Sequence, residues 1–152
     1  LSKFKEAEFA TRKAIELKPN HFQAHSNLGS ILTNLGKLKE AELITRKAIE
    51  LQPTFVDAHI NLGEILIEQG KLNEGEQSLL KAIEVNPKNW KSYFHISKFY
   101  SREKKFREAF RLINSALKYD PKNHIVQGEF TRLKYILGKY DEIYHFKIKD
   151  KN

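Results

Sequence analysis

The sequence repeats with a period of 34 residues, and this period constrains the fold more than any other feature. Phe22–Phe55 and Val56–Asn89 carry the same residue at 17 of 34 aligned positions. The prolines follow the same spacing: they are Pro19, Pro53, Pro87 and Pro121. A fixed period of about 20–50 residues is typical of stacked arrays, in which each repeat packs only on its neighbours. The sequence therefore predicts one elongated array rather than a central globule.

Each repeat predicts two helices joined by a tight turn. Between Phe22 and Leu35, apolar side chains fall on one side of a helical wheel drawn at about 100° per residue, and polar side chains fall on the other. Gly36 supplies the positive φ that ends this helix, and a second helix follows until Pro53 stops it. The helices predicted in this way span residues 22–35, 38–51, 56–69 and 72–85. The expected fold class is all-α, a solenoid of antiparallel helix pairs.

The remaining repeats are less regular. Trp90–Asn123 has diverged but keeps the apolar pattern, with Lys104 in place of the turn glycine. Residues 1–21 match only the second helix of a truncated repeat. Residues 124–152 predict a degenerate repeat that caps the array, because terminal repeats are usually atypical. Its expected parts are a helix over His124–Leu137 that stops at Gly138, a short helix over Tyr140–Lys147, and a frayed tail.

The first predicted helix, Phe4–Leu17, lacks its partner helix and should expose apolar side chains such as Phe4, Phe9 and Ile15. An exposed apolar patch favours association, so self-association through this helix is possible. The chain does not begin with Met, which indicates a piece of a longer protein.

Composition excludes several classes of site. The chain has no cysteine, so disulfides, thiolate metal sites and cysteine nucleophiles are absent. No apolar run approaches the roughly 18–20 residues that span a bilayer, and we expect a cytoplasmic protein. The formal net charge is +8, but residues 90–123 carry +6 of it and residues 56–89 carry −3. The positive charge is therefore concentrated in residues 90–123, and its explanation should lie in that repeat rather than in the whole chain.

Recurring residues at fixed places in the repeat identify a resemblance. A Leu-Gly pair recurs as Leu28-Gly29 and Leu62-Gly63, and small residues recur at Ala7, Ala41, Gly75 and Ala109. With the prolines, these positions resemble the signature of the tetratricopeptide repeat family. The sequence departs from it with His25 and His59 at the aromatic Trp position and Thr11 and Thr45 at the Phe position. The resemblance implies a right-handed superhelix whose first helices line a concave groove that binds an extended peptide or a partner's helix.

The polar sides of the first helices define the groove expected here. They are Gln23, Ser26, Asn27, Ser30, Thr33 and Asn34, then Asp57, Ile60, Asn61, Glu64, Ile67 and Glu68, then Lys91, Phe94, His95, Lys98, Ser101 and Arg102. Asn27 and Asn61 occupy the same place in successive repeats. Similar asparagines in O-GlcNAc transferase form a ladder that holds a peptide backbone, because a carboxamide both donates and accepts. The alternative is that these asparagines are solvated or bond an adjacent helix.

The basic residues of the third repeat have more than one interpretation. Lys91, Lys98 and Arg102 could receive an acidic segment or a C-terminal carboxylate. Alternatively, Lys98 pairs with Glu64 and Arg102 with Glu68 between neighbouring first helices, which we favour. The basic block over residues 102–111 could contact nucleic acid phosphates, but no aromatic stacking platform accompanies it. We therefore favour a solvated basic face, and nucleic acid is not an expected partner.

His25 and His59 are not a metal pair on this reading, because both lie on the packing side of their helices without a third ligand. No catalytic motif occurs, so we expect no enzymatic activity and no cofactor.

The leading hypothesis is a scaffold that binds a protein or peptide in its groove. Asn27 and Asn61 would hold the backbone of the bound segment, and Ile60 and Phe94 would be apolar anchors. Acidic residues of the partner would lie over Lys98 and Arg102. The alternatives are a substrate-recruiting or dimerising module of a larger enzyme such as a glycosyltransferase, and RNA binding through the basic block.

Overall fold

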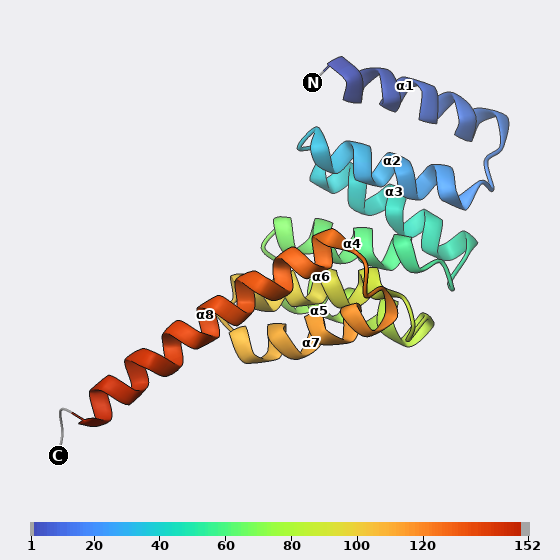
Figure 1. Ribbon diagram of the computed structural model, residues 1–152. Helices are drawn as coiled ribbons and strands as arrows, with labels where there is room; N and C mark the ends of the chain where they lie inside the picture. The colour runs from blue at the N-terminus through green and yellow to red at the C-terminus, as the bar shows by residue number, and fades with distance from the viewer. Residues whose placement is uncertain (1, 150–152) are drawn as a thin grey trace. The chain divides into compact units, whose positions relative to one another are not determined.

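The computed structural model describes residues 2–149, with side chains as far as Lys139, and this range contains α-helices and turns but no strand (Figure 1). The helices are α1 (Ser2–Leu17), α2 (Phe22–Asn34), α3 (Leu38–Leu51), α4 (Val56–Glu68), α5 (Leu72–Val85), α6 (Trp90–Arg102), α7 (Phe106–Tyr119) and α8 (His124–Lys149). Among them, none combines the length and the apolar character that crossing a bilayer requires.

The helices pack as pairs, α2 with α3, α4 with α5, and α6 with α7. The chain divides into two compact parts, Leu1–Pro87 and Lys88–Asn152, which we call the N-terminal and C-terminal parts. In the N-terminal part, α1 packs on α2, α3 packs on α4, and the first helices α2 and α4 also contact each other. In the C-terminal part, α7 packs on α8. The N-terminal part is thus a stack of two helix hairpins with α1 packed on the first, and the C-terminal part is one hairpin with α8 packed on it. Both are all-α solenoid arrangements.

The turn within each hairpin has the same geometry. Gly36 has φ 73°, Gly70 has φ 80°, and Lys104 takes the same left-handed conformation with φ 59°. In each turn the following amide closes a helix cap, as when Lys37 N donates to Leu32 O and Lys105 N to Tyr100 O, both at 2.9 Å. A lysine in this conformation is strained by about 1–2 kcal/mol relative to the right-handed region, which glycine avoids.

Each part has its own core. In the N-terminal part a buried cluster of Leu28, Leu32, Ala41 and Ile65 is flanked by Ile15 and Ile44. In the C-terminal part the buried cluster is Ala109, Ile113, Ala116, Val126 and Leu133, and aromatic side chains from α6, α7 and α8 pack around it. The helix pairs approach closely where a glycine meets a neighbour: a Cβ added at Gly29 would lie 2.0 Å from Thr45 Oγ1.

The two ends differ from the middle of the array. None of the residues of α1 is buried, and Phe9 is 66% and Leu17 is 83% exposed, as expected of a second helix without its partner. Ile15 was also expected to be exposed, and this is wrong because it is half-buried against the cluster of Leu28 and Leu32. Self-association through this surface remains a prediction. At the other end, the expected stop at Gly138 is wrong, because α8 runs through it to Lys149. Glycine tolerates helical φ and costs only about 1 kcal/mol there, so it need not end a helix. The frayed tail was predicted to begin after Lys147, but Ile148 and Lys149 still belong to α8. The rest of the predicted tail, residues 150–152, lies outside the described residues.

Candidate functional site

The first helices of the N-terminal part enclose a polar hollow of about 160 Å³ between α2 and α4. It is lined by Ser30, Thr33, Asn34, Asn61, Glu64 and Glu68. All six side chains belong to the groove surface expected from the sequence. The hollow exists because α2 and α4 are adjacent first helices, so their polar sides meet where each repeat follows the last.

Hydrogen bonds decide what this hollow offers a ligand. Asn61 Nδ2 donates to Ser26 O at 3.2 Å and to Ser26 Oγ at 3.0 Å. Asn34 Nδ2 donates to Ser30 O at 2.9 Å, and the Thr33 hydroxyl donates to Gly29 O at 2.9 Å. A carbonyl only accepts, so both amides must turn their nitrogens to the backbone, which leaves their oxygens as acceptors. With two carboxylates beside them, the lining can accept N–H groups, ammonium or guanidinium.

Asn27 and Asn61 differ in their surroundings despite their shared place in the repeat. Asn27 is exposed, whereas Asn61 is half-buried and bonds the adjacent helix through Ser26. The alternative reading, in which an asparagine bonds a neighbouring helix, thus describes Asn61 in this structure. Its role in holding a peptide backbone remains a prediction, and it would act there through its oxygen.

Ile60 was expected as an exposed apolar anchor, and this is wrong because its side chain is only 3% exposed. The reason lies in the register of the repeat. Ser26, 34 residues earlier, is also buried, with 1% exposed, although it too was expected on the groove. This position of the first helix lies at the border of its polar side, where neighbouring helices meet, and a helical wheel for a single helix does not show the neighbour.

In the C-terminal part the expected site residues lie on α6. Phe94 is half-buried and meets Trp90 edge to face, with ring centroids 6.3 Å apart. Lys98 Nζ lies 5.6 Å from the centroid of the Phe94 ring, and His95 packs at a right angle to that ring. Lys91, Lys98 and Arg102 are exposed. This surface joins an aromatic ring to several cations, and the pairs of Glu64 with Lys98 and Glu68 with Arg102 remain predictions.

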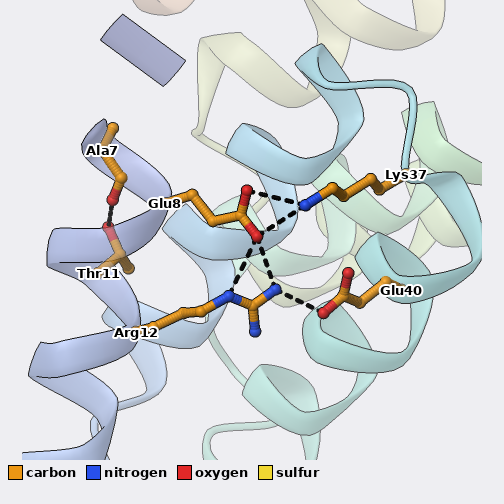
Figure 2. A network of polar contacts seen from close by, with 6 residues as sticks. All are labelled: Ala7, Glu8, Thr11, Arg12, Lys37 and Glu40. Atoms are coloured by element: carbon orange, nitrogen blue, oxygen red, sulfur yellow. Dashed lines mark hydrogen bonds and ion pairs between the residues drawn. The ribbon is translucent and has the colours of Figure 1, made fainter. Parts of the chain in front are cut away.

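A charged network links successive helices of the N-terminal part, and the sequence reading missed it (Figure 2). A carboxylate oxygen of Glu8 on α1 lies 2.8 Å from a guanidinium nitrogen of Arg12 and 2.9 Å from the ammonium nitrogen of Lys37. The Arg12 guanidinium also lies 2.5 Å from a carboxylate oxygen of Glu40. Hydrogen bonds from Lys37 and Arg12 lower the pKa of Glu8. The same contacts recur 34 residues later among Glu42, Arg46, Lys71 and Glu74.

The second copy of the network has the more strongly perturbed carboxylate. Lys71 donates to Glu42 at 2.9 Å, and this bond, followed by those from Arg46 and Gln69, lowers the pKa of Glu42 to about 2 despite partial burial. Lys71 follows the turn glycine, so the network fastens α3 to the turn that joins α4 to α5. The signal that could have revealed it is that the charged residues of the network recur unchanged at the 34-residue spacing, which the packing of an apolar core does not require.

The two histidines have structural partners. His25 Nε2 lies 2.8 Å from Pro19 O, and His59 Nε2 lies 2.8 Å from Pro53 O. In α8 the corresponding residue, Gln127, donates to Pro121 O at 2.7 Å. The side chain at this position of the repeat therefore hydrogen-bonds the proline carbonyl in the preceding turn. Within the described residues, no three His, Asp or Glu side chains gather as a metal would need.

Comparison with known proteins agrees with this architecture. Two models described as tetratricopeptide repeat match the chain, one over residues 10–42 and 45–77 and the other over residues 91–123. Together these matches cover more than half of the chain. No curated protein matches it.

Solved structures share the fold at low sequence identity. TTC0263, a thermophilic tetratricopeptide repeat protein of Thermus thermophilus, superposes with a TM-score of 0.83 at 16% identity, over 89% of this chain and 75% of that chain. MamA gives 0.70 at 20% identity, over 96% and 86%. YrrB, described as having an unusual peptide-binding site, gives 0.66 at 22% identity, over 82% and 64%. Such identities show the fold alone, and with the matched repeats they lead to one conclusion: the chain belongs to the tetratricopeptide repeat family.

Proposed function

We propose that the chain is a protein-interaction scaffold that binds an extended peptide segment along the first helices of its repeats. The observation that carries this proposal is the polar hollow between α2 and α4, lined by six first-helix side chains. Repeat arrays use such extended surfaces for binding. A tetratricopeptide repeat protein of the same fold, YrrB, is described as having a peptide-binding site, which supports the general role.

In the N-terminal part the bound segment would be held mainly through its hydrogen-bond donors. Asn61 offers its side-chain oxygen, because its nitrogen is bonded to Ser26. Asn27, which is exposed, offers both a donor and an acceptor to a main chain. Glu68 lies in the same lining and adds negative charge, so a lysine, an arginine or backbone N–H groups of the partner would suit this surface.

In the C-terminal part the partner would present the opposite chemistry. Phe94 replaces Ile60 as the apolar contact, because it is half-buried rather than buried. Lys98 over its ring and the exposed Arg102 favour an apolar residue followed by an acidic one. A cation beside an aromatic face can still bind a carboxylate, since the interaction with the ring is worth only about 0.5–1 kcal/mol at exposed sites.

The test is selection of binding peptides from a random library, followed by affinity measurements on matched variants. Asn27→Ala and Asn61→Ala should each lower the affinity for a selected peptide about 3–10-fold, the range for loss of one hydrogen bond. Asn73→Ala is the control, since Asn73 is an exposed asparagine on the second helix α5. Glu68→Gln should lower the affinity for peptides that carry lysine or arginine. Peptides whose affinity is the same for all four variants would contradict binding on the first helices.

A further inference from the structure

A cluster of positive charges surrounds the turn between α6 and α7 in the C-terminal part. Its five members, which we call the basic tip, are Arg102 at the end of α6, Lys104 and Lys105 in the turn, and Arg107 and Arg111 on α7. All five side chains are exposed. Two glutamates lie in the same stretch, so residues 102–111 carry a net charge of +3.

Three of the five positive charges do not belong to the pattern of the repeat. The residues at the places of Arg102, Lys104 and Arg111 in the two preceding repeats are Asn34 and Glu68, Gly36 and Gly70, and Leu43 and Gln77. The two preceding hairpins thus form without a cation at any of these places. The packing of the hairpin therefore does not explain why the third repeat carries them.

Lys104 is held in an unfavourable backbone conformation. Its φ is 59°, in the left-handed region that Gly36 and Gly70 occupy in the preceding turns. A side chain at such a position strains the backbone, whereas glycine does not. The Lys104 side chain forms no ion pair with another described residue that would offset this strain. Backbone strain at a residue other than glycine is frequent at functional sites.

The positive charges of the basic tip are less neutralised than those of the N-terminal part. There, Lys37 and Lys71 each lie 2.9 Å from a glutamate oxygen. Lys105, at the same place in the third repeat, lies 5.3 Å from the centroid of the Tyr100 ring, and this contact leaves its charge in place. Arg111 has no ion pair within the described residues. The ligand that suits this surface is therefore an anion.

The surroundings of these charges favour a nucleic acid over an acidic protein segment. Protein interfaces are centred on well-packed apolar and aromatic side chains, but Phe106 and Phe110 are half-buried and no large apolar side chain of residues 102–111 is exposed. Phosphates need no apolar contact, because lysine and arginine release their counterions on binding. The chain also has a pI of about 9.5, as is typical of nucleic-acid-binding domains.

We propose that the basic tip binds the sugar–phosphate backbone of a single-stranded nucleic acid without reading its bases. A flexible strand can follow the end of α6, the turn and the side of α7 that carries Arg107 and Arg111, which are four residues apart and share one face. No exposed ring is present in the tip for bases to stack on. The sequence alone favours a solvated basic face, and the strained Lys104 and the charges without ion pairs are what favour a ligand.

The direct test is fluorescence anisotropy with a labelled oligouridylate of about 12 nucleotides. We expect a Kd of about 10–100 µM at about 100 mM salt, in the range of non-specific binding. The logarithm of the binding constant should fall with the logarithm of the salt concentration with a slope of about −3, as expected for four or five phosphates of a single strand. Oligothymidylate of the same length should bind equally, because only the backbone is contacted.

Two variants remove charge by restoring residues of the preceding repeats. Lys104→Gly should keep or raise the Tm, because glycine relieves the strain. It should lower the affinity about 5-fold at about 100 mM salt and make the slope shallower by about 0.7, which corresponds to one phosphate contact. Arg111→Gln should have the same effect on binding. Lys39→Gln is the matched control, since Lys39 is the exposed counterpart of Arg107 in the first complete repeat, and it should bind like the wild type.

Competition experiments decide between this ligand and other anions. Oligoglutamate of equal charge that displaces the labelled strand as well as unlabelled oligouridylate does would assign the tip to an acidic protein segment. Displacement by phosphatidylserine vesicles at a lower concentration of negative charge would assign it to a membrane surface. Either result would overturn the proposal, as would a salt-independent Kd, or an affinity that is the same in Lys104→Gly, Arg111→Gln and Lys39→Gln.

Discussion

The close approach of α2 and α3 predicts that Gly29→Ala destabilises the protein and that Thr45→Ala reverses the effect. An ideal Cβ at Gly29 would lie 2.0 Å from Thr45 Oγ1, and the next atoms are Thr45 Cβ at 3.3 Å and Ala41 O at 3.5 Å. Thr45 is fully buried, so its hydroxyl cannot move into solvent. Once that oxygen is gone, the remaining contacts are tight but tolerable.

The magnitudes follow from opposing terms. Overpacking of a close-packed core costs about 1–3 kcal/mol, while replacing a helical glycine by alanine gains about 1 kcal/mol. Gly29→Ala alone should therefore lose about 1 kcal/mol of unfolding free energy. Thr45→Ala removes a buried methyl, worth about 0.8 kcal/mol, but it also removes a hydroxyl that has no partner, so it should be nearly neutral. In that background Gly29→Ala should stabilise by up to about 1 kcal/mol.

The assay is a double-mutant cycle by urea denaturation, monitored by far-UV circular dichroism, with the wild type, both single variants and the double variant. The expected coupling between positions 29 and 45 is about 2 kcal/mol, within the range for residues in contact. If Gly29→Ala changes the unfolding free energy equally in both backgrounds, to within about 0.5 kcal/mol, the close approach of the two helices is not as described.

Three further predictions concern the turn, the charged network and the first helix. Lys104→Gly should raise the unfolding free energy by about 1 kcal/mol, because glycine adopts φ 59° without strain; a lower urea midpoint would contradict this. Glu42 has a depressed pKa, so its contribution to stability is present above the unfolded value near 4.5 and is lost as the pH falls towards 2. Glu42→Gln should therefore be about 0.5–1 kcal/mol less stable than the wild type at neutral pH, with the difference shrinking as the pH falls from about 4.5 through about 2; a constant difference in a pH series of melts would be inconsistent with that role. The exposed Phe9 should support self-association at high concentration in analytical ultracentrifugation, and Phe9→Lys should reduce it; a wild type that stays monomeric would argue against it.

Much of the fold could be predicted because its causes are local and periodic. Gly36 and Pro53 mark the ends of helices by their own backbone chemistry, and the observed α2 and α3 end within one residue of the predicted limits. Gly138 shows the limit of this reasoning. A glycine permits a helix stop but does not impose one, and α8 continues through it.

The candidate site was less predictable because it depends on how neighbouring helices meet. The wheel places Ile60 near the polar side of its own helix, but the repeat buries that position. The bond from Asn61 to Ser26 joins two repeats, and no property of either helix alone indicates it.

In a periodic chain, the residues that keep the period and those that break it carry different information. Charged side chains do not fill an apolar core, so the recurrence of Glu8 as Glu42 and of Lys37 as Lys71 is explained by the ion pairs that they form between helices. At a buried position a break in the period changes the packing instead. Where Thr45 gives way to Leu79, a Cβ at the facing glycine, Gly63, would lie 2.7 Å from Leu79 Cγ, so each repeat adjusts its helix spacing to its own residue.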